Sequence, residues 1–201
     1  MTRLSMLVFA VLAFVACKNP GAGSADTAKY PGTEAGAKQL LSEIRTSEDP
    51  GAMTRALKPT TADFKAVYTD DVAGQMERGF EKLWADPKAV IATKQDHTDV
   101  ILSKISSDDL AKWTPQAVME FPGGYKRVGP KLKPGLTVYR WKYVKPGEQI
   151  GTSFDGLIYV NSHWAWFPKP WRVLDSDGGG SDAAGSASAA AGSAAPAVGG
   201  W

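Results

Sequence analysis

Both ends of the chain lack the apolar residues from which a hydrophobic core is built. From Ser176 to Trp201, Gly, Ala or Ser fills 21 of 26 positions. Residues 18–36 combine Asn, Pro, Gly and Ser without an apolar period, which is typical of a flexible spacer. A folded domain is therefore expected within residues 37–175, a stretch of 139 residues that suits one domain with one core. We expect a disordered arm on each side of this domain, with the tail at residues 176–201.

The first sixteen residues have the layout of a bacterial export signal. A basic start at Arg3 precedes an apolar run from Leu4 to Ala16 that only Ser5 interrupts. Thirteen residues form a helix of about 20 Å, which is too short for the roughly 30 Å hydrocarbon core of a bilayer. The pattern predicts a signal peptide over residues 1–16 and not a membrane-spanning helix.

Cys17 is the single cysteine of the chain and directly follows Phe14-Val15-Ala16. This segment resembles the lipobox of bacterial lipoproteins, although Phe14 stands where that family usually has leucine. The resemblance implies that the Cys17 thiol receives a diacylglyceryl group, that the preceding peptide is removed, and that the new amino terminus is acylated. Two alternatives are an ordinary signal peptide followed by an unrelated cysteine, and a disordered N-terminal tail.

The lipobox also implies a location. Residues 17–36 would tether an exported domain to a membrane through the acylated Cys17, and several acyl chains make such an anchor stable. Similar lipoproteins with aspartate after the cysteine tend to stay in the inner membrane, whereas this chain has Lys18. The resemblance therefore favours the outer membrane of the cell envelope in an organism with two membranes.

The first half of the domain has the apolar spacing of helices. Asp49-Pro50 supplies a cap and a first-turn proline, Thr60 or Thr61 caps a further helix, and Asp70 opens the longest amphipathic run, which ends at Asp86-Pro87. The residues expected to face the core are Leu40, Leu41, Ile44, Met53, Ala56, Leu57, Phe64, Val67, Tyr68, Val72, Met76, Phe80, Leu83 and Trp84.

From Leu136 onward the apolar residues alternate, as in strands with one face toward a core. Turn residues at 145–148 and at Asn161-Ser162 divide this region into three strands, with a bulge or bend at Asp155-Gly156. Residues 89–93 could form a strand, residues 100–105 a strand or a helix, and residues 107–113 a short capped helix. The sequence predicts an α+β fold in which the N-terminal helices pack on one face of a C-terminal antiparallel meander.

Residues 154–172 carry a second resemblance. The turn at Asn161-Ser162-His163-Trp164, followed by Trp166-Phe167-Pro168-Lys169-Pro170-Trp171, is similar to the terminal hairpin of small bacterial NTF2-like and SnoaL-like proteins. The similarity covers about a third of the domain and includes no catalytic motif. It implies a cone-shaped α+β fold whose concave sheet face can enclose a pocket, and it assigns no activity.

Three residues are candidates for acid–base chemistry in such a pocket. His97 lies between Asp96 and Asp99, and His163 follows a turn; these are the two histidines of the chain. Asp155 is a further candidate acid or base. The competing interpretations are a loop or capping role for His97, a surface position for His163 and a cap of the Gly156 bend for Asp155. The sequence contains no nucleophile elbow, phosphate loop, dinucleotide fingerprint or metal-ligand spacing, so we predict no cofactor and no metal.

Charge and aromatic residues suggest where a ligand could bind. Lys and Arg outnumber Asp and Glu by nine to three between Gly124 and Asp175, whereas residues 37–86 have seven against nine. Basic residues that alternate with aromatic ones could bind an anionic glycan, an acidic headgroup or an acidic envelope protein. A solvated strand face and core tryptophans are the alternative. The candidate ligand-binding residues are Tyr139, Arg140, Trp141, Lys142, Trp164 and Trp166.

Three functions fit these observations. We favour an anchored envelope lipoprotein whose domain binds a partner or a small ligand without catalysis. The first alternative is an NTF2-like pocket enzyme that uses His97, Asp155 or His163, and the second is a structural envelope component. A net charge of +2 and the expected export argue against nucleic acid as a partner.

Overall fold

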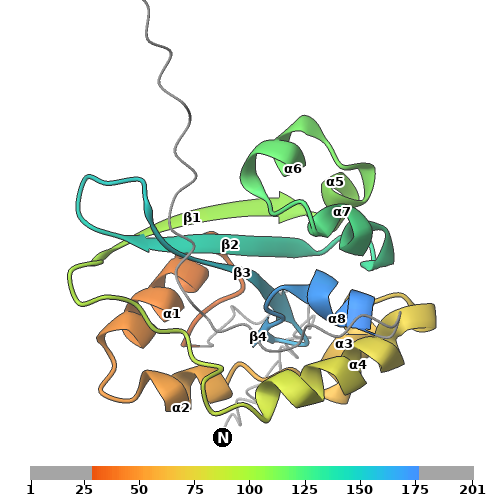
Figure 1. Ribbon diagram of the computed structural model, residues 1–201, viewed down its shortest axis with the longest axis horizontal. Coiled ribbons are helices and arrows are strands. Elements are labelled where there is room, and N and C mark those ends of the chain that lie inside the picture. The colour runs from red at the N-terminus through yellow and green to blue at the C-terminus, as the bar shows by residue number, and fades with distance from the viewer. Residues whose placement is uncertain (1–28, 177–201) are drawn as a thin grey trace, which may run out of the picture.

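The computed structural model describes residues 29–176, and the chain folds there into helices and one antiparallel sheet (Figure 1). This confirms the predicted α+β class. The elements in chain order are α1 (Glu34–Thr46), α2 (Pro50–Arg55), α3 (Thr61–Val67), α4 (Asp70–Trp84), β1 (Asp99–Ser106), α5 (Ser107–Lys112), α6 (Pro115–Glu120), α7 (Tyr125–Val128), the 3-10 turn η1 (Gly129–Lys131), β2 (Thr137–Val144), β3 (Gly151–Val160), β4 (His163–Trp166) and α8 (Pro170–Ser176).

The sheet has the order β1-β2-β3-β4, and every neighbouring pair is antiparallel. The predicted three-stranded meander corresponds to β2, β3 and β4. A fourth strand, β1, adds to its edge, so residues 100–105 are a strand and not a helix. Residues 89–93 form no strand and belong to the connection between α4 and β1.

The bulge predicted at Asp155-Gly156 is present. Tyr139 pairs with Leu157 while Arg140 pairs with Asp155, so Gly156 has no partner on β2. Gly156 has φ = +86°. Its carbonyl accepts a hydrogen bond from the Phe167 N–H over 2.8 Å. A residue with φ in this range and another strand this close has no room for a side chain.

The alternation along the strands gives the sheet two buried faces. Strand β4 and the residue after it illustrate this, because Trp164 and Trp166 join one hydrophobic cluster while Ala165 and Phe167 join the other. The cluster with the tryptophans packs against α1 and α2, and the other cluster packs against α3, α4, α5, α7 and α8. The N-terminal helices therefore cover both faces and not one, since the strands bury apolar side chains on both sides.

The ends of the domain differ from the expected boundaries. Helix α1 begins at Glu34, three residues before the start of the predicted domain, with Thr33 as its N-cap. Helix α8 was not predicted, because Pro168 and Pro170 indicate the end of a strand; Pro170 instead occupies the first position of the helix, where proline costs no hydrogen bond. The predicted signal peptide, Cys17 and most of both arms lie outside the described residues.

We predict that Gly156→Ala destabilises the domain more than Gly147→Ala does. Both glycines have positive φ, at +86° and +78°, but a Cβ at Gly156 overlaps the Phe167 carbonyl, whereas a Cβ at Gly147 meets no atom within 4 Å. Gly147→Ala should lower the free energy of unfolding by about 1 kcal/mol, and Gly156→Ala by about 1–3 kcal/mol more. Urea unfolding followed by circular dichroism measures both, and equal losses would contradict the close approach.

Candidate functional site

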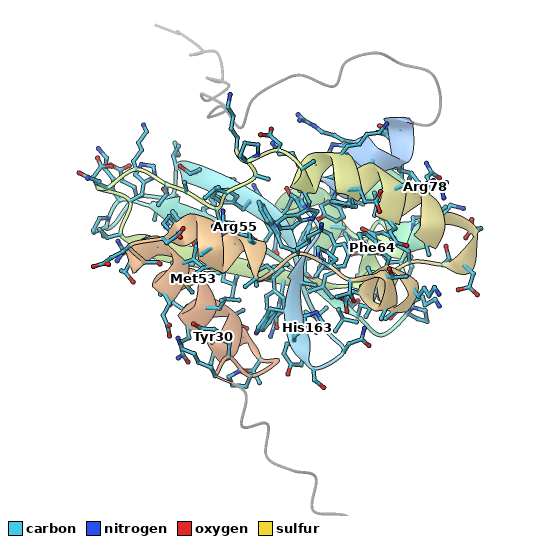
Figure 2. The ribbon with its side chains drawn as sticks, turned by 90° about the horizontal axis from the view of Figure 1, so that it is seen from below. Tyr30, Met53, Arg55, Phe64, Arg78 and His163 are labelled. Atoms are coloured by element: carbon cyan, nitrogen blue, oxygen red, sulfur yellow. The ribbon has the colours of Figure 1, made fainter. Side chains whose placement is uncertain are left out.

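A groove opens on the side of the domain where α1 and α2 meet β4. Figure 2 shows this side, with Tyr30 and Met53 near one another and His163 across from them on β4. The groove has a volume of about 380 Å³. We call it the Tyr30 groove and define it by its lining residues, which are Lys29, Tyr30, Leu40, Met53, Ala56, Leu57, Ser162, His163 and Trp164.

The segment before α1 forms one wall of the Tyr30 groove. The Trp164 indole N–H donates to the Tyr30 carbonyl over 3.0 Å. The Tyr30 hydroxyl donates to Glu43 Oε2 over 2.7 Å, and Lys29 Nζ lies 2.7 Å from the same oxygen. Residues 29–33 therefore form a strap, fixed to α1 and to β4, although the sequence places them in the spacer.

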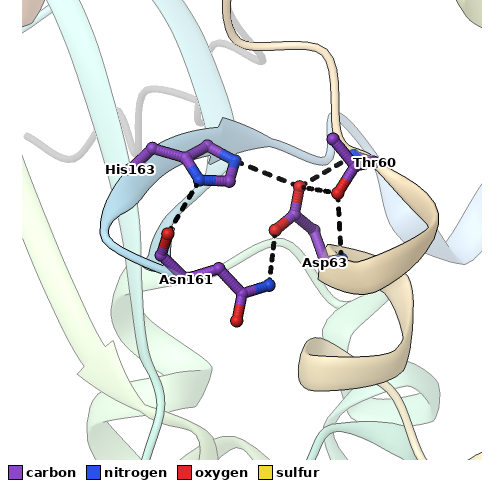
Figure 3. Close-up of polar contacts among 4 residues, drawn as sticks. All are labelled: Thr60, Asp63, Asn161 and His163. Atoms are coloured by element: carbon purple, nitrogen blue, oxygen red, sulfur yellow. Dashed lines mark hydrogen bonds and ion pairs between the residues drawn. The ribbon is translucent and has the colours of Figure 1, made fainter.

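A buried carboxylate lies beside the groove and joins α3 to the β3–β4 turn (Figure 3). Asp63 is 0% exposed. Its Oδ2 accepts hydrogen bonds from the Thr60 N–H over 2.7 Å and the Thr60 hydroxyl over 2.8 Å, and lies 3.1 Å from His163 Nε2. Its Oδ1 accepts from the Asn161 amide over 2.7 Å.

The Asp63 carboxylate belongs to a capping box, because the Thr60 hydroxyl also accepts from the Asp63 N–H. Burial disfavours the ionised carboxylate, but hydrogen bonds from Thr60 and Asn161 and the proximity of His163 outweigh burial, so the pKa of Asp63 is lowered. The carboxylate is thus held as a buried anion at the start of α3.

His163 has an oxygen acceptor at each ring nitrogen. Nε2 faces Asp63, and Nδ1 lies 3.2 Å from the carbonyl of Asn161 in its own turn. Both ring nitrogens thus face oxygens of the protein, and neither is left for a hydrogen bond with a substrate. The geometry suits a latch between the turn and α3 better than a general base.

Asp155 lies elsewhere, in the interior under α7 and α8. Its Oδ1 accepts from the Tyr125 hydroxyl and from the Lys169 N–H, each over 3.0 Å. Burial raises the pKa of Asp155, and these two hydrogen bonds oppose the rise. Its carbonyl accepts from the Trp166 indole over 2.9 Å. The residue fastens the bulge of β3 to the segment that enters α8.

His97 lies in the connection between α4 and β1 and is 6% exposed. Its Nδ1 lies 3.4 Å from the Thr93 hydroxyl, and its Nε2 lies 3.9 Å from Asp96. His97 and Asp155 do not line the Tyr30 groove. The three candidate acid–base residues therefore have separate sets of partners and do not form one site.

The four aromatic candidates for ligand binding on the sheet are all buried, and one of them lines the Tyr30 groove. Tyr139, Trp141 and Trp166 are between 1% and 5% exposed and pack in the core beneath α1 and α2. Of the predicted aromatic residues, Trp164 is the one that lines the groove. Tyr139 instead borders a separate hollow beside β1 and α6, and Trp141 and Trp166 are covered by α1 and α2.

The basic residues of the C-terminal half have structural partners. Lys131 and Lys133 pair with Asp71 and Asp70 at the start of α4, over 2.7 and 3.0 Å. The Arg140 guanidinium donates to the Glu120 carbonyl at the end of α6, and Lys142 donates to the Gln149 carbonyl over 3.3 Å. The charge asymmetry of the sequence thus contributes to contacts between the two halves of the domain.

Sequence reasoning missed Tyr30 and Asp63 as site residues. Asp63 had a readable signal, because Thr60-Thr61-Ala62-Asp63 is the spacing of a capping box. Tyr30 had none, since Tyr30-Pro31-Gly32 is typical of a spacer, and its contact with Trp164 of β4 joins residues that are distant in the sequence.

No family model, curated protein or solved structure gives a significant match. Within residues 29–176, no cluster of His, Cys, Asp or Glu could hold a metal ion. In the same part of the chain, no helix is both long and apolar enough to cross a bilayer.

We predict that Asp63→Asn lowers the free energy of unfolding by about 1–3 kcal/mol at pH 7, since an amide cannot accept all the hydrogen bonds of the buried carboxylate. A lowered pKa means that this contribution is full above the unfolded pKa of about 3.9 and is lost as the pH falls through the folded value. The difference between wild type and Asp63→Asn should therefore shrink on acidification.

Urea unfolding between about pH 7 and pH 3 measures this difference across the range in which carboxylates titrate. Glu148→Gln is the control, because Glu148 is an exposed carboxylate in the turn after β2. A difference that stays constant down to the lowest pH would contradict the buried anion.

Proposed function

We propose that this protein is a lipid-anchored envelope lipoprotein whose folded domain binds an apolar ligand in the Tyr30 groove without converting it. The observation that carries the binding half is the groove itself, which combines an aliphatic floor with a tryptophan and a polar rim. Small-molecule sites share this composition, in which a few polar groups border an apolar surface.

The contacts of the acid–base candidates support binding without catalysis. Both ring nitrogens of His163 face acceptors that belong to the protein, and Asp155 is bonded to Tyr125 and Lys169. A catalytic base needs a lone pair that a substrate can reach. These groups instead fix the turn and the bulge that shape β4, which forms one wall of the groove.

The anchoring half of the proposal rests on the sequence. The apolar run from Leu4 to Ala16, the small Ala16 and the single Cys17 suit export followed by acylation. Eleven residues lie between Cys17 and Lys29, where the strap begins. At about 3.3–3.6 Å for each extended residue, this stretch spans at most about 40 Å, so the anchor would hold the groove near the membrane.

We predict that wild-type protein incorporates an alkyne-labelled fatty acid and sediments with membranes, and that Cys17→Ser loses at least about nine-tenths of the label because acylation needs the Cys17 sulfur. A matched control combines Cys17→Ser with Ser24→Cys, which restores a thiol outside the lipobox and should stay unlabelled. Label that persists in Cys17→Ser would refute the anchor.

The binding half has its own test. Anilinonaphthalene sulfonate, an apolar fluorescent anion, should bind the full chain carrying Cys17→Ser with saturable fluorescence. Ala56→Trp fills the groove and should weaken this binding at least about tenfold, whereas Ala92→Trp, at an exposed position outside the groove, should change it less than about twofold. Equal binding by both variants would refute the groove and favour a structural envelope component.

A further inference from the structure

We propose that the Tyr30 groove takes a single acyl chain from a lipid of the membrane, with the anionic headgroup of that lipid at Lys29. This inference rests on the proposed function and names the ligand of the same groove. It follows from four features of the site, which are the hydrogen-bonding state of its floor, the charge at its rim, the position of Lys29 on the path to Cys17, and its volume.

The floor of the groove offers hydrocarbon contact and few hydrogen bonds. Leu40, Met53, Ala56 and Leu57 are aliphatic or thioether side chains. The Trp164 indole N–H is already bonded to the Tyr30 carbonyl, and the Leu57 carbonyl accepts from the Trp166 N–H over 2.9 Å.

This floor discriminates between a peptide and an acyl chain. A peptide segment would place its own N–H and C=O groups against apolar surface, where each unpaired group costs free energy. An acyl chain has no such groups and gains from every CH₂ that leaves water.

One end of the groove can receive a negative charge. Lys29 Nζ contacts Glu43 and lies 4.9 Å from the centre of the Tyr30 ring, and its side chain is 67% exposed. An ammonium group has three donors, so Lys29 can contact a carboxylate or phosphate while it keeps Glu43. Ser162 and His163 also line the groove.

Lys29, at the rim of the groove, lies where the polypeptide would leave toward the membrane. Lys29 lines the groove and is also the residue at which the path to Cys17 begins. The bilayer surface would then lie within about 40 Å of the groove, the greatest length of the intervening chain. A lipid is therefore the apolar ligand with the nearest access.

The size of the groove limits the ligand to one acyl chain. Its volume of about 380 Å³ is near the lower end of the 300–1,000 Å³ that is usual for small-molecule sites. We therefore expect a single-chain lipid, or one chain of a phospholipid, in preference to a whole diacyl lipid.

The test uses the full chain carrying Cys17→Ser, so that its own acyl groups are absent, with anthroyloxy-palmitate as the fluorescent probe. We expect saturable binding that Met53→Lys weakens at least about tenfold, because an ammonium group replaces part of the apolar floor, whereas Met119→Lys stays within about twofold. Met119 is 78% exposed on α6 and lies outside the groove, which makes it a matched Met-to-Lys control.

Two further measurements keep the proposal falsifiable. Circular dichroism checks that Met53→Lys folds, and Ala56→Trp, which blocks the groove without adding charge, should reduce probe binding equally. Equal binding by the Met53→Lys and Met119→Lys variants would overturn the inference. Binding of anilinonaphthalene sulfonate without displacement by palmitate would overturn this inference alone and leave the proposed function in place.

Vesicles test whether the bound acyl chain comes from a membrane lipid. Vesicles of phosphatidylethanolamine with lysophosphatidylglycerol should displace the probe, and vesicles of phosphatidylethanolamine alone should displace less of it. Lys29→Met should reduce this difference at least about threefold, since the headgroup then loses its cationic partner. Displacement by free palmitate but by neither vesicle would refute a membrane lipid as the source.

Discussion

The position of the β3–β4 hairpin depends on one buried carboxylate. Asp63 lies at the start of α3, yet it bonds Asn161 and contacts His163 in a turn about a hundred residues later. A buried anion is tolerated only where hydrogen bonds surround it, so the helix and the turn are held in a defined arrangement. The next residue after His163 is Trp164, which lines the Tyr30 groove and bonds the strap. The shape of the groove thus depends on a contact made by the residue directly before Trp164.

Elements whose signals are local could be predicted from the sequence. Asp49-Pro50 and Thr60 cap helices as expected, and the alternation after Leu136 gives the strands and the bulge at Gly156. Residues 100–105 stayed ambiguous because a short apolar run fits a strand as well as a helix. Their pairing with β2 decides between the two, and that pairing spans a long stretch of sequence.

The site was harder to predict because it depends on contacts between distant residues. Tyr139, Trp141 and Trp166 lie at alternating positions of their strands, and this pattern alone does not tell a core face from a binding face. Helices α1 and α2 cover them. The reverse holds for Tyr30, which lies among residues typical of a spacer. It forms part of the groove wall because it bonds Trp164 and Glu43. The NTF2-like cone stays a prediction.

The connections of the sheet bear on the order in which the domain can assemble. Strands β2, β3 and β4 are joined by short turns, whereas about thirty residues that include α5, α6 and α7 separate β1 from β2. Closing a short loop costs less chain entropy than closing a long one. We therefore expect the two C-terminal hairpins to form early and β1 to join the edge late. Until β1 arrives, the outer backbone groups of β2 would be open to another extended chain, which makes this edge the place where newly made protein is most prone to associate.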